Sequence, residues 1–125
     1  MNLLLDTHIL LWWLDDHALL PVNAREAIAD PDNVIILSAA VILEIRIKQG
    51  IGKLEIAPNF YNVIKEQGFE MLAITSDHAY AVGDLPTHHR DPFDRILIAQ
   101  AMLEGFTLVT HDAIFNKYPI PVLGV

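Results

Sequence analysis

Short apolar runs alternate along the chain with longer segments that carry helix signals. The apolar runs show no alternation of polar and apolar positions, which is typical of strands buried on both faces of a parallel sheet. The predicted strands are Asn2–Leu5, Val34–Leu37, Met71–Ile74, Thr107–Thr110 and Val122–Gly124.

The segments between these runs begin and end at residues that favour helix termini. Ser38 can cap the segment that stops at Gly50, and Pro21 suits a first helical position. The predicted helices are Thr7–Asp16, Pro21–Ala29, Ser38–Gln49, Pro58–Gln67, Ser76–Val82 and Pro92–Glu104. This β-α-β-α order predicts an α/β fold with a central parallel sheet of four to five strands and helices on both faces.

Length and composition narrow the class of protein. The 125 residues suffice for one domain with one core, and a hydrophobic share of 53% makes disorder a poor explanation. There is no cysteine, which excludes a disulfide scaffold and a thiolate metal site and fits a reducing cytoplasm. The start, MNLLLD, lacks the basic region of a secretory signal, and the run VIILSAAVIL is too short to span a membrane.

The formal net charge of −8 argues against a basic surface that binds nucleic acid directly. It does not exclude an enzyme whose acids hold metal ions, because bound cations reverse the local field. The positions of the acids therefore decide which reading is better.

Several acids follow predicted strands, and ligands of open α/β sheets bind beyond the carboxyl ends of strands. Asp6 ends the first strand, and Asp112 follows the fourth strand. Glu44 lies in the helix after the second strand, and Asp94 lies in the first turn of the helix after HHRD. If the first and fourth strands are neighbours, these four acids can converge on one edge of the sheet.

Helix capping offers a purely structural explanation for most of these acids. Asp6 can cap the helix that begins at Thr7, and Asp112 can cap a short helix through Phe115. Asp91 and Asp94, with proline between them, match the N-cap and N3 positions of a helix start. Capping is the favoured explanation for Asp91 and Asp112, whereas for Asp6 and Asp94 the two explanations are equal.

Glu44 is the exception, because an acid in the middle of a helix gains nothing from capping. Its neighbours one turn away, Ala40, Val41 and Ile47, are all apolar. A pair with Lys48 is the structural alternative, and we favour it less than a role in a site.

Convergence of the four acids at neutral pH would persist mainly if a cation occupied the cluster, although protonation would relieve part of the repulsion. Two carboxylates ~6 Å apart repel by roughly 3 kcal/mol at an effective dielectric constant near 20. Four carboxylates make six such pairs, or ~15 kcal/mol in total, which is comparable with the stability of a whole domain. Oxygen ligands without cysteine favour Mg²⁺ or Mn²⁺, and such an ion can activate water for phosphodiester hydrolysis.

Four segments, in this order, resemble the PIN-domain family and most closely its VapC-type toxins of bacterial toxin–antitoxin pairs. They are LLLDTHILLWWL, SAAVILEIRIKQGIGKL, HHRDPFDRILIAQA and LVTHDAIF. The resemblance implies a parallel sheet sandwiched by helices, Mg²⁺-dependent RNA cleavage, an antitoxin that blocks the acidic pocket, and a homodimer. The acids of the family fall on Asp6, Glu44, Asp94 and Asp112, of which Asp112 is the least constant.

Other residues invite roles in binding. Arg90 and Arg95 could contact RNA phosphate or pair with the neighbouring acids, and Thr7 could orient a metal-bound water. Trp12 and Trp13 lie on a helix that is apolar nearly all round, so we expect partner contact there in preference to simple burial.

The six histidines are weaker candidates. We expect His88 and His89 to lie in a solvated or RNA-facing loop, because adjacent side chains diverge and zinc pairs need longer spacing. His8 and His111 adjoin candidate ligands and could tune the site, touch substrate, or only pack beside it.

Two other functions stay open at this point. One is a PIN-like interaction module that does not cleave, although its acids are intact. The other is a phosphatase or phosphoacceptor, which lacks support because Asp6 is followed by Thr7 and His8 instead of the Asp-x-Asp pattern, and MLAIT has no aspartate.

Overall fold

The computed structural model describes residues 1–125 and contains one five-stranded sheet in the order β3-β2-β1-β4-β5. All its strand pairs are parallel, as in the register of Leu4 with Ile36 on one side and with Leu108 on the other. The strands are β1 (Asn2–Leu5), β2 (Val34–Ser38), β3 (Glu70–Leu72), β4 (Thr107–Val109) and β5 (Val122–Leu123). The predicted parallel sheet is confirmed, and the first and fourth strands are neighbours, which is the condition for convergence of the acids.

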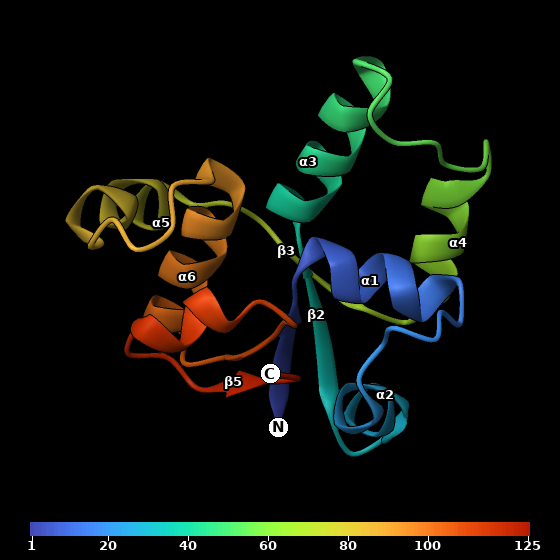
Figure 1. Cartoon of the computed structure of the whole chain (residues 1–125), viewed down its shortest axis with the longest axis horizontal. Helices are drawn as coiled ribbons and strands as arrows, with labels where there is room; N and C mark the ends of the chain where they lie inside the picture. Colours follow the sequence, from blue (N-terminus) through green and yellow to red (C-terminus); the bar gives the residue numbers. More distant parts are fainter.

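Helices cover both faces of the sheet (Figure 1). Figure 1 shows α1, α2 and α4 on one side of the strands and α5 and α6 on the other, with α3 beyond the ends of the strands. The helices are α1 (Thr7–Leu14), α2 (Val22–Ala29), α3 (Ala39–Gly50), α4 (Phe60–Glu66), α5 (Ser76–Ala81) and α6 (Pro92–Glu104), with the 3-10 helices η1 (Val82–Asp84) and η2 (Ala113–Lys117). None of these helices combines the length and apolar character needed to cross a membrane.

The predicted elements are all present, and the errors lie at their ends. The first helix stops at Leu14 and not at Asp16, because Asp16 has a φ of 48° and leaves the helical conformation. Pro21 precedes α2 as its N-cap instead of occupying the first helical position. The C-terminal end of α6 is capped by Gly105 in the left-handed conformation, as predicted.

The central strand explains why the apolar runs do not alternate. Leu3, Leu4 and Leu5 are completely buried, because β1 has a neighbour on each edge and helices on each face. Leu108 of β4 and Ile98 of α6 belong to the same core. This core carries β1 and β4 rigidly side by side, so the residues that follow the two strands are held close together.

Gly124 is the position where the fold depends most directly on glycine. Its φ is +102°, and an added Cβ would lie 2.5 Å from the backbone oxygen of Thr110. We therefore expect Gly124→Ala to lower the free energy of unfolding by about 2–4 kcal/mol. Urea unfolding beside Gly50→Ala, where the added Cβ meets no atom within 4 Å, measures this; equal midpoints for the two variants would contradict it.

Candidate active site

The strand order reverses between β1 and β4, and the residues after these strands begin the site. Asp6 follows β1 and is buried. One carboxylate oxygen accepts the backbone N–H of Ile9 at 2.9 Å and caps α1, and the other accepts the Thr110 hydroxyl at 2.5 Å. Burial raises the pKa of Asp6, while these two hydrogen bonds act in the opposite direction. Capping and a place in the site therefore coincide at Asp6.

Glu44 enters the site from the middle of α3 and is also buried. Its Oε1 accepts the Thr7 hydroxyl at 2.5 Å, and its Oε2 lies 2.5 Å from Lys48 Nζ. The pair with Lys48, which sequence analysis favoured less, is thus present, because residues four apart on a helix face the same side. Thr7, which could orient a metal-bound water, donates its hydroxyl to Glu44 in this structure.

Asp94 occupies the first turn of α6, behind the cap that Asp91 provides. Asp91 Oδ1 accepts the backbone N–H of Phe93 at 2.8 Å and that of Asp94 at 3.2 Å. Burial raises the pKa of Asp94 to about 8, and the charges of neighbouring acids add to the effect. These acids are Asp91, Asp6, Glu44 and Asp112. The charge of every other candidate acid therefore contributes to the raised pKa of Asp94.

Asp112 lies beyond the end of β4. Its Oδ1 accepts the backbone N–H of Ile114 at 3.0 Å and caps η2, as the capping explanation predicts. Its other oxygen lies 3.4 Å from His89 Nε2. The Thr110 hydroxyl that bonds Asp6 also accepts the backbone N–H of Asp112 at 3.1 Å. One threonine thus connects two acids of the site.

His89 is a part of the site that sequence analysis missed. Its side chain is only 12% exposed, and Nε2 lies 3.0 Å from Asp94 Oδ2. Nδ1 accepts the backbone N–H of Asp91, so the neutral ring carries its proton on Nε2, toward the acids. This N–H lies between Asp94 and Asp112 without forming a well-aligned hydrogen bond to either. The predicted solvated position is therefore wrong for His89, although His88 is exposed.

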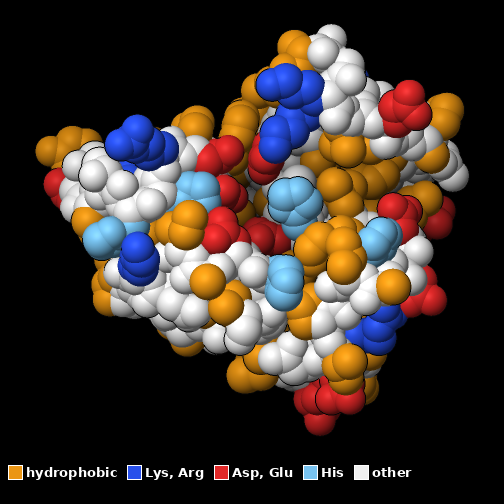
Figure 2. Space-filling model, in the orientation of Figure 1, with side chains coloured by type: hydrophobic (Ala, Val, Ile, Leu, Met, Phe, Trp, Pro, Cys, Tyr) orange, Lys and Arg blue, Asp and Glu red, His pale blue; other side chains and the backbone are white.

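A shallow hollow of about 260 Å³ opens beside the acids and is lined by Asp6, His8, Trp12, His111 and Asp112. Figure 2 shows acidic side chains gathered at the centre of this face, bordered by histidine side chains. The centroid of the Trp12 ring lies 5.8 Å from that of the His8 ring and 5.9 Å from that of the His111 ring. The hollow thus combines the buried carboxylate of Asp6 and the partly exposed carboxylate of Asp112 with flat aromatic and imidazole surfaces.

The chemistry of these donors fits a hard divalent cation, because they are carboxylate oxygens without sulfur. Their arrangement does not complete such a site: no three His, Asp or Glu side chains lie together closely enough to hold an ion. Both oxygens of Asp6 and both oxygens of Glu44 bind partners within the chain. Asp6, Glu44 and Asp112 therefore lie near enough to act on the charge of Asp94, although they are not arranged to hold an ion.

Arg95 has a different role from the two that sequence analysis considered. Its terminal nitrogens donate to the backbone carbonyls of Val82, Leu85, Pro86 and His89, at 2.9 to 3.1 Å. These four bonds use the four N–H groups of the two terminal nitrogens. Arg95 therefore neither pairs with the acids nor presents a free fork to phosphate; it holds the loop that carries His89.

The apolar surface of α1 is partly covered within the chain. Trp13 Nε1 donates to Gln67 Oε1 at 3.2 Å, next to the C-terminal end of α4. Trp12 and Trp13 are both half-buried against the core. The predicted need for a partner over this whole helix face is therefore smaller than the sequence suggested.

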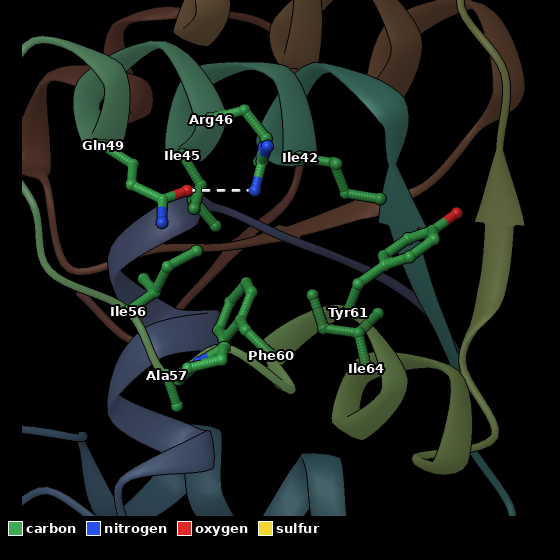
Figure 3. Close-up of a pocket in the computed structure, with 10 residues that line it drawn as sticks. Ile42, Ile45, Arg46, Gln49, Ile56, Ala57, Phe60, Tyr61 and Ile64 are labelled. Atoms are coloured by element: carbon green, nitrogen blue, oxygen red, sulfur yellow. Dashed lines mark hydrogen bonds between the residues drawn. The ribbon is translucent and has the colours of Figure 1, made fainter.

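A second hollow, of about 410 Å³, lies between α3 and α4 and is mainly apolar. Figure 3 shows Ile45, Phe60 and Ile64 pointing into it, while Arg46 and Gln49 meet at its edge. Arg46 donates to Gln49 Oε1 at 3.1 Å. The lining of this hollow contains no acid.

Substitution of Thr110 tests how the site is held together. Thr110→Val keeps the shape of the side chain but removes the donor to buried Asp6 and the acceptor for the Asp112 N–H. We expect the free energy of unfolding at pH 7 to fall by about 1–3 kcal/mol. Urea unfolding beside Thr87→Val, an exposed control, measures this, and equal small losses would show that the Asp6 bond does not stabilise the fold.

The comparisons with known proteins agree with this fold. The family model of the PIN domain matches residues 3–121, and the chain belongs to this family. None of the curated proteins compared with the chain matches it.

Three solved structures illustrate the similarity. VapBC2 from Rickettsia felis, bound to a promoter DNA fragment, has a TM-score of 0.74 and 20% identity, with 98% of each chain covered. DNA-bound VapBC from Salmonella typhimurium has a TM-score of 0.69 and 17% identity over 98% and 97%. A toxin–antitoxin complex from Klebsiella pneumoniae has a TM-score of 0.64 and 22% identity over 96% and 94%. At these identities the similarity shows the fold.

Proposed function

We propose that this chain is a Mg²⁺-dependent endoribonuclease and the VapC-type toxin of a toxin–antitoxin pair. PIN domains are generally nucleases. The observation that carries the proposal is Asp94, whose pKa is raised to about 8 by burial and by four other acids at one end of the sheet. A strongly perturbed carboxyl among other carboxyls marks a functional site. Such a site gains most from a divalent cation.

In this mechanism the acids of the site would bind the cation. Asp6, Glu44, Asp94 and Asp112 would hold the cation, with Mn²⁺ as a possible substitute for Mg²⁺. When bound, the cation supplies an activated water and shields the charge that develops on the phosphate.

The chain itself positions these ligands. Thr110 and the Ile9 N–H fix Asp6, while Thr7 fixes Glu44. The Asp91 cap fixes the first turn of α6 and therefore Asp94. Attack of water on phosphorus with cleavage of the P–O3′ bond gives 5′-phosphate and 3′-hydroxyl ends.

Several properties of this proposal come from similarity. The named solved structures are VapBC or toxin–antitoxin complexes, which supports a cognate antitoxin for this chain. We propose that the protein acts in the cytoplasm as a homodimer of single PIN domains, and that Arg90, which is exposed, contacts RNA. Trp12 and Trp13 remain candidates for partner contact at the half-buried surface of α1.

Mapping new RNA 5′ ends after brief induction in bacterial cells tests the function. The wild-type chain should arrest growth and create 5′-phosphate ends at defined positions, and Glu44→Gln at equal protein level should do neither. Growth arrest without new ends, or identical ends with Glu44→Gln, would favour a binding module that does not cleave.

The phosphoacceptor alternative finds no support. Asp6 is followed by Thr7 and His8 instead of the Asp-x-Asp pattern of such phosphatases, and no aspartate ends β3, where a receiver domain would carry its phosphoacceptor.

A further inference from the structure

Lys48 provides the one lysine or arginine side chain that pairs with an acid of the site. The molecule has one further ion pair between a lysine or arginine side chain and a carboxylate, that of Arg25 and Asp16, and it lies outside the site. Lys48 extends from α3 one turn beyond Glu44, and its Nζ lies 2.5 Å from Glu44 Oε2. Thr7 donates to the other oxygen of Glu44, so each oxygen of this carboxylate has a partner within the chain.

The two partners of this pair differ strongly in burial. The Glu44 side chain is 6% exposed, whereas the Lys48 side chain is 38% exposed. Lys48 therefore reaches a buried carboxylate from the rim of the site on a flexible four-carbon stem, which can also extend into solvent. Moving the ammonium away from Glu44 requires no change in the backbone of α3.

The charge of Lys48 acts on more than one acid. Its pKa is raised chiefly by the hydrogen bond with Glu44, and the charges of Asp91 and Asp94 add to this. One ammonium thus offsets repulsion among carboxylates from two different helices, α3 and α6. A bound divalent cation would offset the same repulsion among these carboxylates.

We propose that the Lys48 ammonium is the counter-ion of the cation-free site and must leave Glu44 before a divalent cation can bind there. This proposal rests on the cation-dependent function above. It explains why the acids share one electrostatic environment although no three of them are arranged to hold an ion. It also makes Lys48 a positioning residue that sets the Mg²⁺ concentration at which the site fills.

Competition and repulsion give this proposal a measurable sign. An ammonium near a divalent ion raises the free energy of the bound state, and it also has to be displaced from Glu44 Oε2. Removing the charge with Lys48→Met, which keeps an unbranched apolar stem, should therefore strengthen Mg²⁺ binding by about tenfold or more. A lysine with a merely structural role predicts the opposite sign, because a misplaced Glu44 binds the ion less well.

The experiment is a Mg²⁺ titration of the thermal unfolding midpoint at pH 8, with EDTA-treated protein and constant ionic strength. Without Mg²⁺, Lys48→Met should melt below wild type, because Glu44 loses its counter-ion. The Mg²⁺ concentration for half-maximal stabilisation should fall about tenfold in Lys48→Met. It should be unchanged in Lys53→Met, which removes an exposed lysine without a partner acid, and close to wild type in Lys48→Arg.

A second pair of variants isolates the contact with Glu44. In a Glu44→Gln background, Lys48→Met should change the Mg²⁺ midpoint far less than in wild type, because the ammonium is no longer held in the site. If Lys48→Met does not fold, Lys48→Gln removes the same charge with a polar side chain and carries the same expectation.

The outcomes separate this proposal from the proposed function. A normal Mg²⁺ response in wild type with equal or weaker binding in Lys48→Met would overturn the role of Lys48 and leave the nuclease proposal standing. A response in Lys48→Met but none in wild type would support the exchange in its strongest form. No response in either protein would overturn both the cation site and the exchange.

Discussion

Asp94→Asn is expected to reduce RNA cleavage by at least about 100-fold, because a direct cation ligand should matter at least as much as the partners that orient such ligands. The folded structure should survive, since Asp91 and not Asp94 caps α6. At pH 8 and without divalent cations the variant should melt at or above the wild-type temperature. Burial and four neighbouring acids disfavour the Asp94 charge, and asparagine carries none.

The matched control for this variant is Asp77→Asn, which changes an exposed aspartate in the first turn of α5. Steady-state cleavage of a labelled RNA and thermal melts of all three proteins give both readouts. Equal loss of activity in the two variants, or a strongly lowered melting temperature for Asp94→Asn, would show that Asp94 is a structural residue.

In the absence of divalent cations, the stability that Asp94 contributes should decrease as pH rises toward about 8. The pKa of Asp94 is raised from 3.8 to about 8 in the folded chain, so the folded state binds this proton more tightly than the unfolded state does. Stability is therefore fully present below the unfolded pKa and is lost as pH rises through the folded pKa. The raised pKa of buried Asp6 acts in the same direction.

Thermal midpoints between pH 5 and pH 9 in EDTA, for wild type and Asp94→Asn, measure this dependence. The wild-type midpoint should fall more steeply with pH than that of the variant. Added Mg²⁺ should restore more stability at high pH, because ligation requires the deprotonated carboxylate. Parallel profiles for the two proteins would mean that Asp94 does not titrate with a raised pKa.

Local signals in the sequence were enough to predict where α1 and α6 begin. Asp6, which ends the apolar run LLL, caps α1, and Asp91 followed by Pro92 begins α6, as predicted. The adjacency of β1 and β4 was a condition of the site and not a deduction, because pairing of strands about a hundred residues apart leaves no local pattern.

The partners of the acids could not be predicted, because they depend on side-chain directions. His89 lies beside Asp94 in a loop whose backbone carbonyls accept hydrogen bonds from Arg95. No rule of sequence spacing describes this interaction. The pair of Glu44 and Lys48 was visible as a spacing of four residues on a helix. A role in the site and an ion pair do not exclude each other here, because the position of Glu44 is compatible with both.

The most direct measurement of the central claim is cleavage of total RNA by the purified chain, free of any antitoxin, in Mg²⁺ or in EDTA. A cation-dependent acidic centre predicts cleavage in Mg²⁺, none in EDTA, and recovery when excess Mg²⁺ is added back to the EDTA sample. Cleavage that proceeds equally fast in EDTA would contradict it and remove the acids from the chemistry.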